Sequence, residues 1–341
     1  MKQKVIIIGG GIAGMEVTAQ LAKQGYEVSL LEKENHLGGN AINWYHLFPD
    51  RKPARDLVNS LKSAIADCAD IHFSAEIHKI EKSDYGYNVN LTDGQNLNAD
   101  AIVIASGFDL FDAGKKEEYG YGIYDNVITS AELEEIFKEQ KPIRTSKGIT
   151  PQRVAFIHCV GSRDEKAGIR YCSKVCCITG VKQAIEVKEK LPEAEVFCFY
   201  MDLRMFDRYF EDLYLEAQTK HGIHFVRGRL SEAGENHDGS LILKVEDTLA
   251  GRPLKINADL MVLLVGITSS KGTAHVCQKT GLQINGDKFM VALDNHTKLN
   301  QTMIPGIFVA GACTGPKSVA ETIADARSAA LNVMNYLNKK N

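Results

Sequence analysis

The sequence lacks an excess of charge of either sign. Its 40 lysines and arginines stand against 43 aspartates and glutamates, which gives a formal net charge of −3 at pH 7. Proteins that bind nucleic acid or anionic membrane surfaces through their net charge carry a basic excess. We therefore expect neither kind of partner.

Long apolar runs are missing as well. The longest, such as Val5–Ile8 and Leu260–Val265, are far shorter than the roughly 20 residues that cross a bilayer as a helix. The first residues, 1–4, lead directly into a strand-like segment and show no signal-peptide pattern. These features predict a cytoplasmic protein without direct membrane insertion.

Cysteines are too few for a disulfide scaffold, since the chain has eight among 341 residues. Four of them are grouped between residues 159 and 177. This grouping indicates metal or redox chemistry in a reducing compartment. The length suggests about two domains, and a hydrophobic content of 44% is enough for a sizeable core.

The amino end carries a dinucleotide-binding fingerprint. Residues 5–8 are typical of a buried strand, residues 15–23 of a helix, and residues 27–31 of a second strand. The turn after the first strand is G-x-G-x-x-G, formed by Gly9, Gly11 and Gly14. The second strand ends in the acid Glu32, 18 residues after Gly14. In this context, glycines that serve only a turn are the weaker interpretation.

Each residue of the fingerprint has a physical role. Gly9 allows the tight turn, Gly11 lets the backbone approach a pyrophosphate, and Gly14 allows the helix to pack closely on the strand. The helix start, with Ile12 and Ala13, would offer N–H groups and the positive dipole end to the phosphates. Glu32 would accept hydrogen bonds from the adenosine ribose, and the neighbouring Lys33 is counted with it among the cofactor-binding residues. The fingerprint alone does not separate NAD from FAD.

Three later segments resemble the flavoproteins with two dinucleotide-binding domains. They are residues 37–40 (LGGN), residues 101–107 (AIVIASG) and residues 306–312 (GIFVAGA). The resemblance implies FAD, and it adds these residues to the site: Gly38, Gly39, Asn40, Ala105, Ser106, Gly107, Gly311 and Ala312. Residues 75–77 resemble the segment whose backbone meets the adenine, which adds Ile77. The usual Gly-Asp pair is Gly311-Ala312 here, so a carboxylate is missing, although a helix starting near Ser318 could direct its dipole toward the flavin.

The second half repeats the strand–helix–strand pattern without the glycine fingerprint. Residues 153–158 predict a strand, residues 178–191 a helix and residues 195–200 the next strand. The intervening turn reads CVGSRD at residues 159–164 and YCSKVCC at residues 171–177. Because a cysteine-bearing loop stands where the phosphates would bind, we expect little or no NAD(P)H binding by this domain.

Four cysteines of this loop follow a C-x12-C-x3-C-C pattern, namely Cys159, Cys172, Cys176 and Cys177. Four thiolates on one loop suit a 4Fe–4S cluster, and soft sulfur ligands also suit zinc. Adjacent cysteines are awkward for a structural zinc site, and a disulfide between them would be strained. A helix dipole and the nearby cations Arg163, Arg170 and Lys174 are expected to lower the pKa values of the thiols. The isolated Cys68, Cys198 and Cys277 are expected to serve packing only.

The cysteine loop, together with residues 310–317 (AGACTGPK), resembles the flavoprotein A subunit of heterodisulfide reductases and of heterodisulfide-reductase-like proteins in sulfur-metabolising bacteria. The resemblance implies that the four cysteines hold a 4Fe–4S cluster beside the FAD. The ferredoxin-type C-x2-C-x2-C-x3-C inserts of larger members do not occur in this sequence. The chain therefore looks most like the short form in the sulfur-oxidising heterodisulfide-reductase-like complex.

This resemblance also implies partners. They are the B- and C-type subunits, in sulfur oxidisers a lipoate-binding protein, and a second copy of the chain within the complex. The alternatives are the flavin subunit of a quinone-interacting complex, a free-standing NAD(P)H-dependent disulfide reductase, and a flavin-stabilised scaffold without electron transfer. A free-standing reductase would need a second phosphate-binding turn and a redox C-x-x-C, and the sequence has neither.

The predicted fold class is α/β, with two Rossmann-like domains of the thioredoxin-reductase type, the second inserted into the first. The expected boundaries are 1–110 and 266–341 for the FAD-binding domain and 111–265 for the inserted domain. Smaller features are a helix at residues 131–139, an amphipathic segment at 207–220 and a turn between strands at 236–239.

Overall fold

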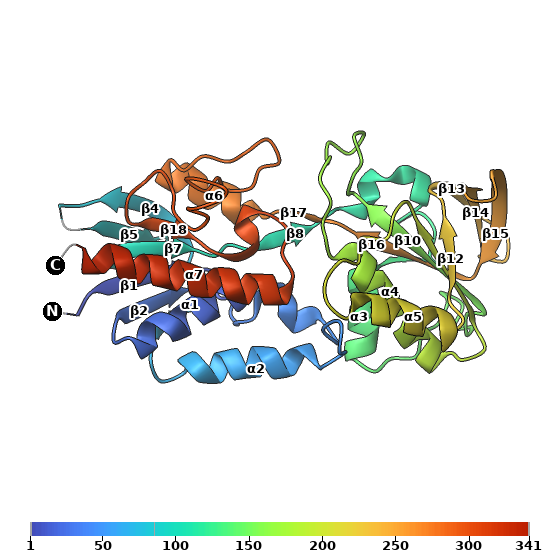
Figure 1. Ribbon diagram of the computed structural model, residues 1–341, viewed down its shortest axis with the longest axis horizontal. Helices are drawn as coiled ribbons and strands as arrows, with labels where there is room; N and C mark the ends of the chain where they lie inside the picture. Colours follow the sequence, from blue (N-terminus) through green and yellow to red (C-terminus); the bar gives the residue numbers. More distant parts are fainter. Residues whose placement is uncertain (1, 85, 340–341) are drawn as a thin grey trace. The chain divides into compact units, whose positions relative to one another are not determined.

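The computed structural model describes residues 2–84 and 86–339 and divides the chain into two compact units (Figure 1). Unit 1 consists of Met1–Ile42, Ala54–Asp109 and Thr268–Asn341, and unit 2 of Asn43–Pro53 and Leu110–Ile267. Residues 43–53 were expected in the FAD-binding domain but belong to unit 2. No helix among the described residues is long and apolar enough to cross a membrane.

Unit 1 is built on a five-stranded parallel sheet. The strand order is β18-β7-β1-β2-β3, with β1 Lys4–Ile8, β2 Glu27–Leu31, β3 Asp70–His72, β7 Ala101–Ile104 and β18 Ile307–Val309. Its central strands are almost wholly apolar and buried, as expected for a parallel sheet covered on both faces.

Two layers cover this sheet. One contains the helices α1 Ile12–Lys23, α2 Ala54–Ile65 and α7 Val319–Asn338 (Figure 1). The other contains the antiparallel meander of β4 Ile77–Lys82, β5 Tyr87–Leu91 and β6 Asn96–Ala99. Alternate residues of β5 pack in one apolar cluster with β1, β7 and β18. Helix α6, Lys271–Thr280, lies against β4.

Unit 2 repeats this three-layer plan. Its parallel sheet has the order β12-β11-β10-β16-β9, with β9 Val127–Thr129, β10 Arg153–Val160, β11 Glu195–Tyr200, β12 His224–Arg227 and β16 Leu260–Val265. Helices α3 Ser130–Lys138, α4 Cys176–Lys190 and α5 Phe210–Thr219 form the helical layer. The second face packs against the meander of β13 Leu230–Glu235, β14 Leu241–Asp247 and β15 Arg252–Ala258.

The two units are connected through short strands. β8 Phe108–Leu110 leads into unit 2, and β17 Ile267–Ser269 leads back and pairs with it. Short 3-10 turns complete the chain at η1 Gly39–Asn43, η2 Ala113–Lys115, η3 Glu117–Tyr119 and η4 Gly311–Thr314.

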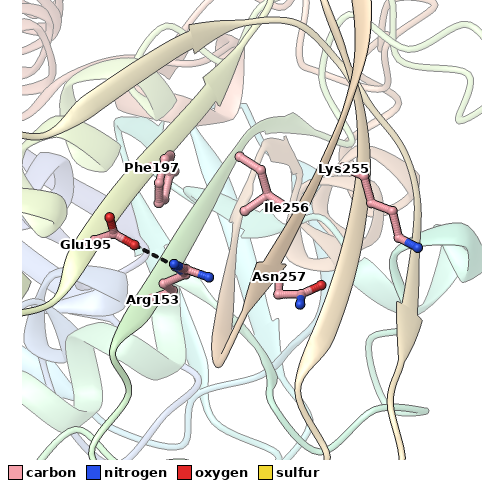
Figure 2. A pocket seen from close by; sticks show the side chains of 6 residues that line it. All are labelled: Arg153, Glu195, Phe197, Lys255, Ile256 and Asn257. Atoms are coloured by element: carbon pink, nitrogen blue, oxygen red, sulfur yellow. Dashed lines mark hydrogen bonds and ion pairs between the residues drawn. The ribbon is translucent and has the colours of Figure 1, made fainter.

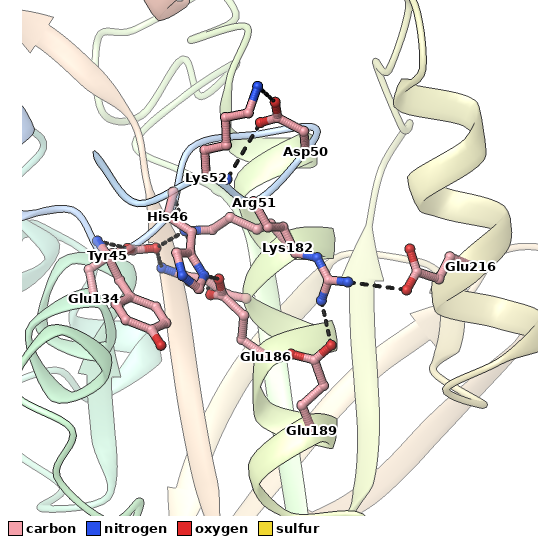
Figure 3. Close-up of polar contacts among 11 residues, drawn as sticks. Tyr45, His46, Asp50, Arg51, Lys52, Glu134, Lys182, Glu186, Glu189 and Glu216 are labelled. Carbon is pink, nitrogen blue, oxygen red and sulfur yellow. Dashed lines mark hydrogen bonds and ion pairs between the residues drawn. The ribbon is translucent and has the colours of Figure 1, made fainter. Parts of the chain in front are cut away.

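The 43–53 segment is held in unit 2 by buried charges (Figure 3). Lys182 on α4 donates to Glu134 on α3 (2.5 Å) and to the backbone carbonyl of His46 (2.9 Å). The His46 ring pairs with Glu186 of α4 (2.8 Å). The three charged side chains, of Lys182, Glu134 and Glu186, are each at most 5% exposed. Their charges are therefore stabilised by one another rather than by water. Farther along, Arg51 reaches α4 and α5 through its own ion pairs.

Most predicted elements are confirmed with small shifts of their ends. The strand 27–31 and the strand 195–200 are found unchanged, and Ser318 caps α7 through a capping box with Glu321. The strand predicted at 153–158 continues to Val160, and the helix predicted from residue 178 starts at Cys176. Cys176 and Cys177 are therefore the first residues of α4 rather than part of the preceding loop.

Candidate functional site

The residues predicted to bind a dinucleotide meet at one edge of the unit 1 sheet. The parallel strands β1, β2, β7 and β18 all end at this edge. The glycine turn follows β1, Glu32 follows β2, Ala105 follows β7 and Gly311 follows β18 shortly after. Open parallel sheets bind ligands outside the carboxyl ends of their strands.

The three fingerprint glycines differ in what surrounds them. A Cβ on Gly14 would lie 1.8 Å from the carbonyl oxygen of Gly9, so α1 packs on β1 too closely for any side chain. Gly9 has a φ of +108°, and a Cβ there would lie 2.4 Å from the carbonyl oxygen of Ala105. A Cβ on Gly11 would meet only Gly39 Cα, at 4.0 Å. The fold requires Gly9 and Gly14, whereas Gly11 faces open space at the start of α1.

Glu32 is tied to the glycine turn. Its carboxylate, in a residue that is 6% exposed, accepts the backbone N–H of Gly10 (2.6 Å) and of Glu34 (2.9 Å). The acid thus stands beside the start of α1, where a ribose next to a bound pyrophosphate would lie. Lys33 points away, since its side chain is 65% exposed and pairs with Glu34.

The glycine pair after β2 packs onto the same turn. Gly38 donates its N–H to the carbonyl of Gly10 (2.9 Å), and Gly39 lies against Gly11. Both glycines have positive φ values, +120° and +53°, and a Cβ on Gly38 would collide with Ile42. Asn40 is fixed by donating its amide to the carbonyl of Phe108 (2.8 Å).

The end of β7 and the start of β4 complete the inner part of this edge. Ser106 shares a hydrogen bond with Thr273 of α6 (2.7 Å), and Gly107 has a φ of +67°. Ile77 is buried, and its carbonyl accepts a hydrogen bond from the ring of His275 (2.8 Å).

The segment after β18 contains two charged residues that sequence reasoning missed. Gly311 lies against Ala13 of α1, which leaves no room for a Cβ, and the neighbouring Ala312 is buried. Asp325 of α7 accepts the N–H of Gly311 (2.6 Å), and Lys317 donates to the carbonyl of Gly311 (3.0 Å). A carboxylate is therefore present near Gly311, although it comes from α7, 14 residues farther along the chain.

The corresponding edge of unit 2 holds the four grouped cysteines. Cys159 is the second-last residue of β10 and has a φ of +61°, at an irregularity in the pairing with β16. The loop that follows is closed on itself, because Arg163 donates its N–H to the carbonyl of Tyr171 (2.9 Å) and the Ser162 and Ser173 hydroxyls are hydrogen bonded. This closure returns the chain, with Cys172, to the end of β10.

Three of these thiols are buried, and this changes their acidity. Burial, with repulsion from neighbouring thiolates, raises the pKa of Cys159 to about 12 against the weaker lowering by Arg163. Burial also raises the pKa values of Cys176 and Cys177. The expectation that cations and the helix dipole lower these pKa values is wrong for the metal-free protein, because desolvation outweighs them. The side chain of Arg170 is 81% exposed and lies 3.7 Å from Glu165.

Hydrogen-bond donors surround the thiols. The backbone N–H of Lys174 donates to Cys172 Sγ and that of Arg204 to Cys177 Sγ, each at 3.4 Å. Arg163, held by Asp202 (2.7 Å), keeps one buried guanidinium nitrogen without a hydrogen-bond partner among the described residues. Leaving a buried polar group unpaired costs about 1–3 kcal/mol. A cation close to Cys159, Cys172 and Cys177 fits an anionic sulfur-bound group in donor chemistry.

All eight cysteines are free, so the alternative of a Cys176–Cys177 disulfide is not realised. Among residues 2–84 and 86–339, no three His, Cys, Asp or Glu side chains converge closely enough to hold a single metal ion. Cys313, in unit 1, donates to the carbonyls of Ala310 and Ile104, and burial raises its pKa to about 12. These contacts are those of a buried cysteine that serves packing.

A cavity of about 520 Å³ lies at the opposite end of the unit 2 sheet (Figure 2). Arg153 and Glu195, the first residues of β10 and β11, form an ion pair in it, and Lys255 of β15 also lines it. The cavity is therefore at the amino ends of the strands, away from the edge where the cysteines meet.

Comparison with known families gives a match over most of the chain. The profile of the family described as pyridine nucleotide-disulphide oxidoreductase matches residues 3–157 and 178–330. The interval left between the two matched parts, residues 158–177, contains all four grouped cysteines.

Two relatives illustrate the likeness in sequence. An iron-sulfur A subunit of the CoB–CoM heterodisulfide reductase of Methanopyrus kandleri is 32% identical, over 97% of this chain and 63% of its own length. The A subunit of the H(2):CoB-CoM heterodisulfide,ferredoxin reductase of Methanothermobacter thermautotrophicus is 43% identical, over 67% of this chain and 36% of its own length. The chain thus spans less than two thirds of either relative.

Solved structures show the fold. Thioredoxin reductase from T. acidophilum superposes with a TM-score of 0.67 at 19% identity, over the whole of both chains. Thioredoxin reductase from Lactococcus lactis gives a TM-score of 0.69 at 17% identity, over 99% of this chain and 100% of that one. The predicted class of two Rossmann-like domains, the second inserted into the first, is confirmed.

Proposed function

Because the chain belongs to the pyridine nucleotide-disulphide oxidoreductase family, as a flavoprotein oxidoreductase related to the A subunits of heterodisulfide reductases, we propose that it is an electron-transfer component of a heterodisulfide reductase-like complex. In this role it carries FAD and a 4Fe–4S cluster and serves dissimilatory sulfur metabolism, in the direction of sulfur oxidation. One observation carries the proposal: four cysteines, from the end of β10, the loop after it and the start of α4, stand where a second phosphate-binding turn would be.

The FAD site is the carboxyl edge of the unit 1 sheet. Gly11 leaves the space that the pyrophosphate needs, and the start of α1, with Ile12 and Ala13, turns N–H groups toward it. Glu32 is already held beside the turn and would accept the ribose hydroxyls. The remaining contacts come from the predicted residues at the edge other than the solvent-exposed Lys33: Gly38, Gly39, Asn40, Ile77, Ala105, Ser106, Gly107, Gly311 and Ala312.

The cluster site is the carboxyl edge of the unit 2 sheet, with Cys159, Cys172, Cys176 and Cys177 as ligands. FAD at the edge of unit 1 and the cluster at this edge would together supply the exchange of electron pairs for single electrons. The chain's own groups would bind the sulfurs, shield them from water and offset their negative charge. Arg163 and the backbone N–H groups of Lys174 and Arg204 are the groups in place for this.

The named relatives are A subunits of heterodisulfide reductases, which supports further subunits as partners, and we propose which ones from the resemblance of the sequence to that family. They are B- and C-type subunits, a second copy of this chain within the complex, and a lipoate-binding protein as the sulfur carrier. The sulfur chemistry itself would take place on another component of the complex. The flavin subunit of a quinone-interacting complex would use the same two cofactors and differs in its partners.

Anaerobic purification of the full chain tests the proposal. The protein should be yellow, release FAD on heating, and hold about four irons and as much acid-labile sulfide after reconstitution. Cys172→Ser should lose the cluster and keep FAD, because the two sites lie in different units. The matched control is Cys198→Ala, a buried cysteine of β11 outside the group, which should keep both. A wild type without iron, or equal iron content in Cys172→Ser, contradicts the cluster.

A further inference from the structure

The ring of His158 is buried in unit 2, and no described residue forms a hydrogen bond with it. His158 is 6% exposed, and neither Nδ1 nor Nε2 has a partner among the described residues. Imidazole always carries at least one N–H donor, whichever tautomer or charge state is present. An orphaned donor of this kind is unusual, because buried polar groups in folded proteins are nearly always paired.

The position of the ring follows from the strand. Val154 and Phe156 of β10 pack in the apolar cluster on the α4 face, and alternation along the strand puts His158 on that same face. The ring edge touches α4 at Gly180, where a Cβ would lie 2.8 Å from Cε1 and 3.0 Å from Nε2.

This contact is close to the cysteines. Gly180 follows Cys176 by four residues, which is about one helical turn, so the two lie on one face of α4. Cys159 is the next residue of the strand. His158 therefore occupies the layer between β10 and α4, about one helical turn from Cys176.

We infer that His158 is a positioning residue of the cluster site, and that its ring N–H donates a hydrogen bond to a sulfur of the group held by the four cysteines. This inference rests on the proposed function, since it needs a sulfur anion at that edge. A hydrogen bond to sulfur stabilises the reduced, more negative state more than the oxidised state, so His158 raises the reduction potential.

The inference predicts opposite effects with and without the cluster. In the metal-free protein, His158→Leu removes an unpaired polar group and should raise Tm. In the anaerobically reconstituted full chain, the same change should lower the potential, so that the ratio of reduced to oxidised cluster at a fixed potential falls about tenfold, equivalent to ~59 mV for one electron. His158→Gln keeps an N–H donor and should stay near the wild-type potential.

Thr18→Val is the matched control, because Thr18 in α1 of unit 1 also buries a hydroxyl that no described residue pairs with. It should raise Tm without changing the potential. The readout is a redox titration followed by the electron paramagnetic resonance signal of the reduced cluster.

The outcomes separate the two proposals. A loaded His158→Leu protein with the wild-type potential overturns the role of His158 and leaves the cluster standing. If His158→Leu does not bind the cluster, whereas His158→Gln binds it with a near-wild-type reduction potential, the role of the ring N–H as a hydrogen-bond donor is supported. If neither variant binds the cluster, the His158 ring supports the site through its shape rather than through a hydrogen bond, and the inference is wrong. A wild type that holds no iron overturns both the inference and the proposed cluster.

Discussion

At the scale of single residues, packing of the fold requires some of the fingerprint glycines, whereas only a bound ligand would require another. Gly14 leaves no space for a side chain, whereas Gly11 is bordered only by Gly39 Cα at 4.0 Å. Gly11 also has an extended backbone conformation, with φ −75°, that any residue can adopt. The conformation and packing of the protein do not explain a glycine at position 11, but a closely approaching pyrophosphate does.

This difference gives a prediction. Gly11→Val should fold with unchanged secondary structure but bind no FAD, because its side chain fills the space of the pyrophosphate. Gly14→Ala should fail to fold or melt far below the wild type, since its methyl group would overlap the Gly9 carbonyl. Circular dichroism, thermal melting and flavin content of the two variants are the measurements. Stoichiometric flavin in Gly11→Val would contradict the FAD site.

Arg163 is the charged residue with the clearest expected effect on the cluster. Its guanidinium is partly buried and influences the pKa of Cys159, and one of its nitrogens has no hydrogen-bond partner in the described part of the chain. Arg163→Gln removes a positive charge near the sulfurs and should shift the cluster potential to more negative values. Arg170→Gln, at an exposed site in the same loop, is the control and should leave the potential within experimental error. Equal shifts in both variants would mean that only the net charge of the loop matters.

The thiols themselves should differ in reactivity. Cys68 is exposed, whereas Cys313 is fully buried with its pKa raised to about 12. Because the folded pKa of Cys313 lies above the unfolded value, its burial stabilises the protein at neutral pH. That contribution falls as the pH rises from near 9 toward 12. Alkylation of the native protein at pH 8, read by peptide mass spectrometry, should modify Cys68 and spare Cys313. Rapid modification of Cys313 would argue for an accessible redox thiol.

At the scale of elements, the helices α3 and α4 are joined to the 43–53 segment by Lys182. Two carboxylates, Glu134 and Glu186, lie within 2.5 Å and 3.6 Å of its ammonium group. Removing one partner of a buried ion network leaves uncompensated charge, which costs about 3–5 kcal/mol. Lys182→Met should therefore lose about this much stability in urea unfolding. Lys244→Met, which breaks the exposed pair of Lys244 with Glu232, should change it by less than ~1 kcal/mol.

Elements that depend on local sequence could be predicted from it. The strand, turn and helix around Gly9–Gly14 follow from periodicity and glycine spacing, and the start of α7 from the capping residues Ser318 and Glu321. Contacts between separate elements could not be predicted from the sequence. Asp325 contacts Gly311 from the second turn of α7, and nothing in the sequence marks it as a partner. The acidity of the cysteines also failed as a prediction, because burial by distant residues decides it.

At the scale of the whole molecule, the two sheets have the same plan but differ at their carboxyl edges. The edge of unit 1 has a glycine turn, and the edge of unit 2 has the cysteine loop. We therefore expect NADH and NADPH to leave the flavin of the isolated chain oxidised, while dithionite bleaches it. Anaerobic absorbance at the flavin band is the measurement. Rapid bleaching by either nicotinamide would favour a free-standing reductase, and a flavin that dithionite cannot reduce would favour a scaffold.

The 43–53 segment has a consequence for taking the protein apart. Since it belongs to unit 2 but lies in sequence inside unit 1, the chain changes unit four times rather than the two that a simple insertion requires. A gene fragment encoding only residues 110–267 would omit His46 and Arg51. The buried charges of Lys182, Glu134 and Glu186 would then lose the contacts with residues 43–53 that shield them from water. Any transplant of the cysteine-bearing domain onto another flavoprotein would have to carry this short stretch along. The inserted domain is therefore not a portable module, and its exchange between proteins would require two separate pieces of DNA.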